Sequence, residues 1–506
     1  MSSDGRDVPT SQRPNFPTAF VLFVLIAAAA AIPIRSYDYF WHLATGRWIV
    51  EHRALPAVDP LAVASAKTPW INGEWLYEVV LYATHWSDAA TSLLNALLVA
   101  AIFTAAYLAA SRLIEWPLAL LAAAVAYAGA SDRMGVRPST AAALLVVVAI
   151  ALLSSKLRRP ELAYAALTIL WINVHPSALL APVIALFFGR WIVAGTSALA
   201  LLVNPHGWHA VRAPFALTSL AGSGEFVNAE WLPSDPRLFP LLYLTAIAMV
   251  IALIVARERR AWRWAILLMF VVLAARHVRY QVFYFAALPL LVPPLRVRRD
   301  AIAAAAIIPI AWAFMHDEHR LGVDAERFPI RAVSKLKSSG LAGNIYNVDQ
   351  FGGLLEWTFY PERRALTDGR NELFRELIAE DARARQDSRA WHALIAKYGV
   401  ALAVDEYSKE KIEVVDVATG QARAMPASLV RYRRRDWALI AFDDAAMVFA
   451  RRASFPAERL AALEYRYVVP DDPSMRYPKE ARDEIARARR EFGDIRVVRE
   501  LEAGAN

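Results

Sequence analysis

The sequence predicts an all-α polytopic membrane bundle of about 11 transmembrane helices, followed by a C-terminal soluble α/β domain. Hydrophobic residues make up 57% of the 506 residues and charged residues 21%, compared with about 45–50% and about 25% in an average soluble protein. The apolar excess lies almost entirely before residue 316. This distribution excludes a wholly soluble, disordered or collagen-like chain.

A helix needs about 20 apolar residues to cross about 30 Å of hydrocarbon. The first apolar run, Phe16–Ile34, meets this length. It lacks a convincing small-residue cleavage site, so we interpret it as an anchored helix rather than a signal peptide. The further predicted spans are residues 89–111, 117–130, 140–155, 162–175, 177–189, 191–203, 238–256, 264–275, 282–295 and 300–315.

Clusters of basic residues predict the orientation, because Lys and Arg are enriched in cytoplasmic loops. Clusters around Arg158, Arg260 and Arg298 put the N-terminus in the cytoplasm and everything after residue 316 outside a bacterial inner membrane. The predicted parts are a cytoplasmic tail at 1–15, a transmembrane domain at 16–315 with outer loops at 35–88 and 204–237, a periplasmic α/β domain at 316–455 and a charged helical tail at 456–506.

The two outer loops combine aromatic and acidic residues. In the first loop, Phe40–Arg53 has helical spacing with one apolar face, which predicts a helix lying along the membrane surface. The second loop contains Trp208 and Trp231. Because tryptophan favours the membrane interface, the two loops could enclose a site at the lipid boundary.

After residue 317 the pattern changes to short strands that alternate with helices, which is typical of a small α/β domain. Residues 352–359 and 374–398 are predicted to be helical, and 478–492 is predicted to be a solvated surface helix. The predicted strands are Asn344–Val348, Arg364–Thr367, Val400–Val404, Trp437–Phe442 and Met447–Ala450.

Two motifs in this domain have both a functional and a structural interpretation. Gly352-Gly353 could cradle a phosphate, but it lacks the spacing of either nucleotide-binding fingerprint, so a tight strand-to-helix turn is favoured. Asp368-Gly369-Arg370 is either a polar site or a turn with an ion pair.

Charge and cysteine content exclude several partners and cofactors. The net charge is +8, but the basic residues form short clusters between apolar runs, which argues for membrane orientation and against nucleic-acid binding. Because cysteine is absent, disulfides, thiolate metal sites and cysteine nucleophiles are excluded. No His/Asp cluster has metal-ligand spacing, so the sequence predicts no cofactor and leaves a divalent cation as an alternative.

The segment Asp38–Gly46, DYFWHLATG, connects the sequence to a known family. An acid directly after the first helix, inside an aromatic outer loop, resembles the polyprenyl-phosphate-sugar-dependent glycosyltransferases of the C-type membrane fold. A bacterial branch of this fold is similar at further motifs, which lie at residues 59–60, 70–76, 171–175, 204–207, 352–354 and 367–370.

The resemblance implies an enzyme that moves a sugar from a lipid phosphate to an acceptor hydroxyl outside the membrane. In that family the first-loop acid is the base or a metal ligand, and this role is carried over to Asp38. Many members have a second acid at the next position, where this chain has Tyr39, which argues against a paired-acid or metal-dependent mechanism. The expected partners are a polyprenyl-phosphate-linked sugar, a lipid, glycan or protein acceptor, and membrane lipids.

The residue types in these segments suit sugar transfer. A carboxylate half-shielded by aromatic rings gains basicity, and a base must lie within about 3 Å of the acceptor hydroxyl. Arg276 and Arg279 are candidates for holding the departing lipid phosphate as bidentate donors. The other candidate substrate-binding residues are Trp41, His42, Glu74, His175 and Glu230.

The charged candidates also have structural interpretations. Asp38 could cap the Tyr39–Val50 helix, because acids favour that position. Arg276 and Arg279 could anchor the chain to lipid headgroups.

The same applies to the remaining glutamates and histidines. Glu74 and Glu78 lie four residues apart and could occupy a solvated helix face. His42 on an aromatic face could be a structural histidine, and His175 and His206 could stabilise turns beside proline.

Two other function classes stay open at this stage. A transporter or flippase would place ionisable groups in mid-membrane, whereas those of this chain lie mostly at the ends of apolar runs. A non-catalytic envelope scaffold would use the bundle as an anchor for the outer domain.

Overall fold

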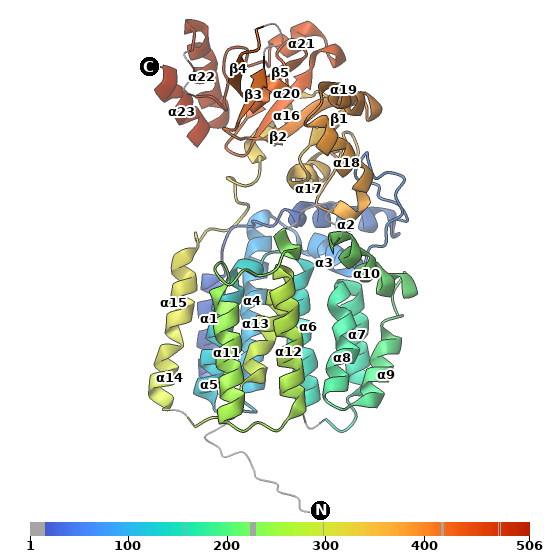
Figure 1. Ribbon diagram of the computed structural model, residues 1–506, viewed down its shortest axis with the longest axis vertical. Helices are drawn as coiled ribbons and strands as arrows, with labels where there is room; N and C mark the ends of the chain where they lie inside the picture. The colour runs from blue at the N-terminus through green and yellow to red at the C-terminus, as the bar shows by residue number, and fades with distance from the viewer. Residues whose placement is uncertain are drawn as a thin grey trace, which may run out of the picture. The chain divides into compact units, whose positions relative to one another are not determined.

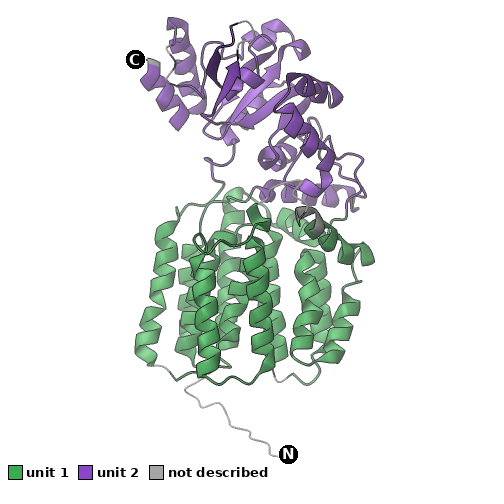
Figure 2. Cartoon of the chain, in the orientation of Figure 1, with its two compact units in different colours: residues 1–36, 71–323 green, residues 37–70, 324–506 purple. Residues whose placement is uncertain are grey.

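The computed structural model describes residues 16–155, 157–222, 229–296, 298–415, 419–473, 475 and 477–505. The predicted cytoplasmic tail, residues 1–15, and residues 223–228 of the second predicted outer loop lie outside these ranges. The chain forms two compact units (Figure 1 and Figure 2). Unit 1 comprises residues 1–36 and 71–323, and unit 2 comprises residues 37–70 and 324–506.

Unit 1 is built from helices, most of which run side by side (Figure 1). Its helices are α1 (Phe16–Ala29), α3 (Trp75–Thr84), α4 (Asp88–Ala110), α5 (Trp116–Ala130), η2 (Ser131–Arg133), α6 (Pro138–Ser154), α7 (Glu161–Val174), η3 (Pro176–Leu179), α8 (Leu180–Phe187), α9 (Trp191–Ala200), α10 (Trp208–Gly222), η4 (Ala229–Trp231), α11 (Pro240–Val255), α12 (Ala261–Arg276), η5 (Val278–Tyr280), α13 (Gln281–Leu291), α14 (Arg299–Ala305) and α15 (Ile307–His316).

The centre of unit 1 is helix α13, in which every residue is buried. It packs against α4, α5, α6 and α12. A Cβ atom on Gly129 of α5 would overlap the ring of Phe285 on α13, so glycine permits the close approach of these two helices. Unit 1 therefore has a conventional close-packed core.

The prediction of about 11 transmembrane helices is wrong. Among the described residues, only two helices are long and apolar enough to cross a membrane, namely Asp88–Ala110 and the continuous stretch Arg299–His316. Other apolar helices have 10–17 residues, and several follow one another after short breaks. A helix of 14 residues such as α7 spans about 21 Å, which is less than the roughly 30 Å of a bilayer core. Several predicted runs, such as 117–130 and 264–275, were already shorter than about 20 residues, so counting each run as a span disregarded the length that a crossing needs.

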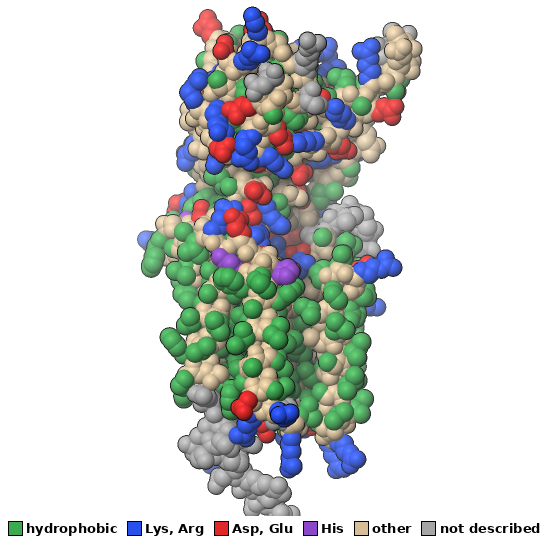
Figure 3. Space-filling model, turned by 90° about the vertical axis from the view of Figure 1, so that its left-hand side faces the viewer, with side chains coloured by type: hydrophobic (Ala, Val, Ile, Leu, Met, Phe, Trp, Pro, Cys, Tyr) green, Lys and Arg blue, Asp and Glu red, His purple; other side chains and the backbone are tan. Residues whose placement is uncertain are grey.

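The outer surface of unit 1 is nevertheless apolar. Figure 3 shows one face of these helices covered by hydrophobic side chains, with charged side chains near the helix ends. On α11 the exposed residues Leu244, Ile247, Ile251 and Ile254 follow one another at intervals of three or four, so they form a stripe on the side that points away from the core. Soluble monomers rarely expose continuous apolar surface of this extent.

Unit 2 contains a four-stranded sheet in the order β1-β2-β6-β5 and a separate two-stranded sheet, β3-β4. Strands β1 and β2 are parallel, and the other neighbours are antiparallel. The strands are β1 (Asn344–Asn347), β2 (Val400–Glu406), β3 (Lys411–Val415), β4 (Ala422–Pro426), β5 (Trp437–Phe442) and β6 (Ala446–Arg451).

The helices of unit 2 include one from the N-terminal part of the chain. Helix α2, expected in an outer loop of the membrane part, belongs to this unit. The helices are α2 (Asp38–His52), α16 (Ile330–Ser339), α17 (Asp349–Phe359), η6 (Asn371–Leu373), α18 (Arg375–Ala384), α19 (Ser388–Lys397), α20 (Ala427–Arg431), η7 (Arg452–Ser454), α21 (Ala457–Ala461), α22 (Lys479–Phe492) and α23 (Arg496–Ala505).

Helix α2 packs closely on helix α17. All residues from Tyr39 to Gly46 are buried. The predicted position of this helix along the membrane surface stays a prediction. Arg47 of α2 donates to the carbonyl oxygen of Tyr360 at 3.4 Å and lies over the ring of Trp357, with 4.7 Å to the ring centroid. This packing places the N-terminal acid Asp38 within unit 2.

Gly352 and Gly353 make this packing possible. A Cβ on Gly352 would overlap the carbonyl oxygen of Thr367, and one on Gly353 would lie 2.7 Å from the amide nitrogen of Trp41. Both glycines lie inside α17 rather than in a loop before it. The favoured strand-to-helix turn is confirmed, because β1 ends at Asn347 and α17 begins at Asp349. The two glycines follow that turn and serve close approach.

Replacing Gly352 by Ala is expected to destabilise unit 2 by about 1–3 kcal/mol, because the added methyl group meets backbone that cannot rotate away. Thermal unfolding of the purified full chain measures this loss. Gly195→Ala is the matched control, since a Cβ there meets nothing within 4 Å and Gly195 lies in a helix. Equal melting temperatures for the two variants would contradict the proposed packing role.

Candidate functional site

Asp38 is the first residue of α2, and Tyr37 occupies the N-cap position. The interpretation of Asp38 as the helix cap is therefore wrong. One carboxylate oxygen, Oδ1, accepts a hydrogen bond from the indole nitrogen of Trp41 at 3.3 Å. The Asp38 side chain is half-buried, so it lies at the boundary of unit 2 rather than in its core.

The turn Asp368–Arg370 lies directly against this carboxylate. A Cβ atom on Gly369 would be 3.3 Å from Asp38 Oδ1 and 4.0 Å from Trp41 Nε1. Gly369 does not have a positive φ, so its backbone conformation does not require glycine. A side chain at this position would crowd the Asp38 carboxylate, which would have to shift by a few tenths of an ångström.

Arg370 is the centre of a buried charge cluster. Its Nε donates to both carboxylate oxygens of Asp368, at 2.9 and 3.0 Å. Its Nη1 lies 3.2 Å from Asp59 Oδ1. Glu356 Oε1 lies 3.7 Å from Arg370 Nη2, which is too far for a hydrogen bond. All four side chains are at most 3% exposed.

Two tryptophan rings cover the guanidinium of Arg370. The distances from the Arg370 Cζ to the ring centroids are 5.2 Å for Trp41 and 4.5 Å for Trp70. A cation held over indole rings in a desolvated site gains electrostatic stabilisation from them. The cluster therefore joins residues 37–70 to the C-terminal part of the chain with both ion pairs and ring contacts.

The pKa values of Glu356 and Asp368 are shifted in opposite directions. Burial, and next the negative charge of Asp368, raise the pKa of Glu356 well above its ordinary value. Burial would also raise the pKa of Asp368, but the charge and hydrogen bonds of Arg370 hold that pKa below its ordinary value. A side-chain hydrogen bond between Glu356 and Asp368 contributes to both shifts, as fits a protonated, neutral Glu356 that donates to the Asp368 carboxylate.

Glu356→Gln is therefore expected to change the pH dependence of stability. Below the unfolded-state pKa both states hold the proton, and as pH rises the unfolded state releases it first, so the wild type loses stability up to the folded-state pKa. Glutamine has no such proton and keeps the size of the side chain. The free energy of unfolding of Glu356→Gln should rise relative to that of the wild type as the pH increases from the unfolded-state pKa to the folded-state pKa, by up to about 1.4 kcal/mol per pH unit. Thermal unfolding at several pH values measures this difference.

The control for this experiment is Glu362→Gln, which removes an exposed carboxyl group a few residues further along the chain. Parallel pH profiles for the wild type and Glu356→Gln would contradict a protonated Glu356.

His42 and Trp41 are both buried, at 1% and 7% exposure. Their rings lie against each other with 3.6 Å between centroids. Their predicted contact with substrate stays a prediction, whereas their contacts within unit 2 are established.

In unit 1 the structure brings Glu74 and His175 together. His175 Nε2 lies 3.8 Å from Glu74 Oε1. The backbone N–H of Ser177 donates to His175 Nδ1 at 3.0 Å, which caps η3 and places the proton of neutral His175 on Nε2. His175 thus has the turn-stabilising role considered in the sequence analysis and also faces a carboxylate.

Buried polar groups that the sequence analysis did not select surround this pair. Glu78 is fully buried and accepts a hydrogen bond from Asn72 Nδ2 at 2.5 Å, so the solvated-face interpretation is wrong for Glu78. Trp75 Nε1 donates to Asn173 Oδ1 at 2.8 Å. The motifs at 70–76 and 171–175 could have indicated this polar group, because both have an asparagine two residues after a tryptophan in an apolar context.

A second group in unit 1 contains the predicted phosphate ligands. The Arg279 guanidinium lies over Trp231, with 4.5 Å to the ring centroid, and His277 Nδ1 lies 2.7 Å from the carbonyl oxygen of Trp231. Arg276 is exposed and has no hydrogen bond or ion pair with the described residues. Glu230 forms an ion pair with Arg137.

Ring contacts connect the two groups of unit 1. The neighbouring centroid distances are 5.9 Å from His175 to Phe283, 6.2 Å from Phe283 to Tyr280, and 6.1 Å from Tyr280 to His277. Trp231 follows at 5.4 Å from His277. The candidate residues Glu74, His175 and Arg279 are therefore joined through one row of aromatic side chains.

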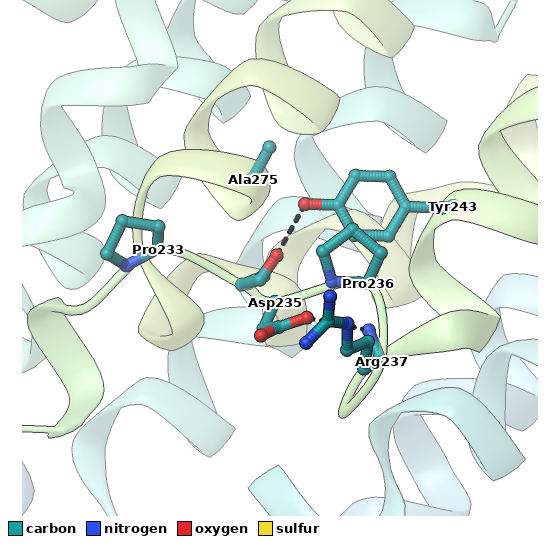
Figure 4. A pocket seen from close by; sticks show the side chains of 7 residues that line it. Pro233, Asp235, Pro236, Arg237, Tyr243 and Ala275 are labelled. Carbon is teal, nitrogen blue, oxygen red and sulfur yellow. Dashed lines mark hydrogen bonds between the residues drawn. The ribbon is translucent and has the colours of Figure 1, made fainter.

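Unit 1 also contains a pocket near the end of α12 (Figure 4). It is lined by Pro233, Ser234, Asp235, Pro236, Arg237, Tyr243 and Ala275. The hydroxyl of Tyr243 donates to the carbonyl oxygen of Ser234 at 2.5 Å, and the Ser234 hydroxyl donates to the carbonyl oxygen of Ala274 at 2.6 Å. These bonds fix the loop after η4 against the end of α12.

Within unit 2, the side chains described beside Asp38 offer few ligands for a divalent cation. The adjoining residue is Tyr39, the Trp41 indole can only donate, and the carboxylate of Asp368 is bound by Arg370. In the part of the chain that the structure describes, no group of three or more His, Asp or Glu side chains is arranged to hold a metal ion.

The predicted site residues fall into both units. Asp38, Trp41 and His42 lie in unit 2, and Glu74, His175, Glu230, Arg276 and Arg279 lie in unit 1. A cavity shared by Asp38 and the two arginines stays a prediction. Asp59 and Arg370 lie in two of the motifs noted above, but their contact could not be predicted because they are 311 residues apart in the chain.

The sequence matches no protein-family model and no curated protein. Among solved structures, the chain is similar to the archaeal oligosaccharyltransferase AglB from Archaeoglobus fulgidus in complex with an inhibitory peptide and a dolichol-phosphate. The TM-score is 0.52 at 11% identity, and the match covers 81% of this chain and 74% of that one. The Archaeoglobus fulgidus oligosaccharyltransferase complex with Zn and sulfate matches with a TM-score of 0.51 at 10% identity, over 81% and 73% of the two chains.

At these identities the likeness concerns the fold. The predicted resemblance to glycosyltransferases that use lipid-linked sugars is confirmed at that level, and the bacterial branch stays a prediction. The fold of the chain is similar to that of these two oligosaccharyltransferase structures.

Proposed function

We propose that this protein is a membrane glycosyltransferase that takes a sugar from a polyprenyl-phosphate donor. The observation that carries the proposal is the fold likeness to oligosaccharyltransferase over 81% of the chain, one example of which was solved with a dolichol-phosphate. A half-buried acid at the start of the helix that follows the first apolar helix supports it. Because fold likeness alone does not assign a function, the proposed reaction is argued from the site residue Asp38.

In the proposed reaction Asp38 is the general base. The acceptor hydroxyl oxygen attacks the anomeric carbon and forms the new C–O bond, while its proton moves to the Asp38 carboxylate. The bond between the anomeric carbon and the phosphate oxygen breaks, and the polyprenyl phosphate leaves with the electron pair. A positioned base contributes about 10²–10⁴-fold to such a transfer.

The cationic side chains of unit 1 suit the leaving phosphate. Arg276 is exposed, and Arg279 is held over Trp231 with its guanidinium half-buried. Planar guanidinium groups bind phosphate oxygens through paired hydrogen bonds. In the proposal these two arginines hold the donor phosphate, and Glu74, His175 and Glu230 contribute to the sugar or acceptor site.

The apolar surface of unit 1 supports a membrane location. The exposed stripe on α11 and two helices long enough to span a bilayer suit a lipid environment. We propose that the protein resides in a bacterial inner membrane with a cytoplasmic N-terminus and an extracytoplasmic C-terminal domain. The acceptor is a lipid, glycan or protein hydroxyl on that side.

The proposal is tested with the purified full chain in lipid vesicles. Radiolabelled polyprenyl-phosphate hexoses and pentoses are supplied together with an extract of envelope acceptors, and transfer of label to an acceptor is measured. We expect label to leave at least one donor with release of polyprenyl phosphate. A correctly inserted protein that transfers no sugar from the whole donor panel would support the scaffold or transporter alternatives instead.

A further inference from the structure

Trp41 contacts both the Asp38 carboxylate and the Arg370 guanidinium. Its indole N–H donates to Asp38 Oδ1 at 3.3 Å, and its ring lies over the guanidinium of Arg370. The two residues Asp38 and Trp41 are three positions apart on α2, which places them on one side of the helix. Trp41 is thus a direct link between the half-buried acid and the buried charge cluster.

The surroundings of Trp41 leave it little freedom to move. Arg370 is fixed by Asp368 and Asp59, the ring of His42 lies 3.6 Å away, and α17 packs on the Trp41 backbone at Gly353. A side chain that is enclosed on these sides loses no further rotational freedom when it donates a hydrogen bond. The indole therefore holds one oxygen of the Asp38 carboxylate and fixes the rotation of that group.

Gly369 contributes from another direction. Its backbone lies so close to Asp38 Oδ1 that a methyl group would be 3.3 Å from the oxygen, although the backbone conformation itself does not require glycine. The turn that carries Arg370 therefore also forms the wall against which the carboxylate rests.

We propose that Trp41 and Gly369 are positioning residues for Asp38, and that the buried Arg370 cluster holds both of them in place. The inference rests on the proposed function, in which Asp38 must present its carboxylate to the acceptor hydroxyl. It assigns Trp41 a task other than stacking on a sugar ring. Because a misplacement of about 1 Å can reduce a rate by about 10²-fold, the orientation of this carboxylate matters for the transfer.

The experiment compares Trp41→Phe with Trp70→Phe in the sugar-transfer assay on the full chain. Both substitutions remove an indole from the same guanidinium, but only Trp41→Phe removes the hydrogen bond to Asp38. We expect both variants to lose similar thermal stability. Trp41→Phe should lower kcat about tenfold with the KM for the donor within twofold, whereas Trp70→Phe should lower kcat by no more than about threefold.

A second variant guards against misfolding of Trp41→Phe. Gly369→Ala keeps every hydrogen-bonding group and crowds the carboxylate, and it should also lower kcat with little change in KM. Equal kcat values for Trp41→Phe and Trp70→Phe, or a wild-type kcat for Gly369→Ala, would overturn the inference. If the wild type transfers no sugar from any donor, the proposed function fails instead, so the two failures are distinguishable.

Discussion

Asp38→Asn is expected to reduce sugar transfer by about 10²–10⁴-fold while leaving the protein folded and inserted in the membrane. Asparagine has nearly the same shape as aspartate, and its amide oxygen can still accept the hydrogen bond from Trp41. It cannot take a proton from the acceptor hydroxyl, so the contribution of a general base is lost. The rate of label transfer from the lipid-linked donor measures the effect, and thermal unfolding reports the fold.

The matched control is Asp88→Asn, because Asp88 is also the first residue of a helix and its substitution removes the same charge near a helix N-terminus. We expect Asp88→Asn to retain the wild-type transfer rate. Similar rates for both variants, or a loss caused only by misfolding of Asp38→Asn, would contradict the role of Asp38 as base.

The sheet of unit 2 could be predicted largely from the sequence, because its strands are short apolar runs between turns. Trp437–Phe442 was predicted with the bounds that the structure has. The predicted strand Arg364–Thr367 is wrong, since only Ala365 forms a bridge, to Ile345. This segment exchanges one pair of backbone hydrogen bonds with Ile345 and accepts two more from Val63 and Ala64, and then it turns beside Asp38. These contacts are tertiary and have no local signature in the sequence.

Helix breaks were harder to predict than helix positions. The predicted helix 374–398 is two helices, and the second begins where the Asp387 side chain accepts a hydrogen bond from the Arg389 N–H. The charged, helix-favouring composition continues through this break, so periodicity alone did not show it. The excess of predicted transmembrane helices in unit 1 has another cause, because the breaks there were predicted but the runs between them are too short to cross a membrane.

The candidate site shows a different limit of sequence reasoning. Asp38 was found from its position after the first apolar run, which is a local feature. Gly369 lies against Asp38, and Arg370 lies over the ring of Trp41 beside it. Both residues reach this place because α2 packs on α17 in unit 2. A single sequence gives no measure of such contacts between residues more than 300 positions apart.

Arg370→Met is expected to destabilise unit 2 by about 3–5 kcal/mol, because it leaves the buried carboxylates of Asp59 and Asp368 without their counterion. For a unit of this size the loss corresponds to a fall in melting temperature of roughly 6–20 °C. Thermal unfolding of the full chain measures it. Arg435→Met removes an exposed arginine that pairs with Asp436 and should leave the melting temperature within about 2 °C.

A second substitution separates charge from packing in this cluster. In Arg370→Met combined with Asp368→Asn, one of the uncompensated charges is removed while the side-chain volume changes little, so the double variant should regain a large part of the lost stability. If the double variant is as unstable as Arg370→Met alone, the loss comes from the packing of the arginine between Trp41 and Trp70. In that case the rings, rather than the ion pairs, join residues 37–70 to the rest of unit 2.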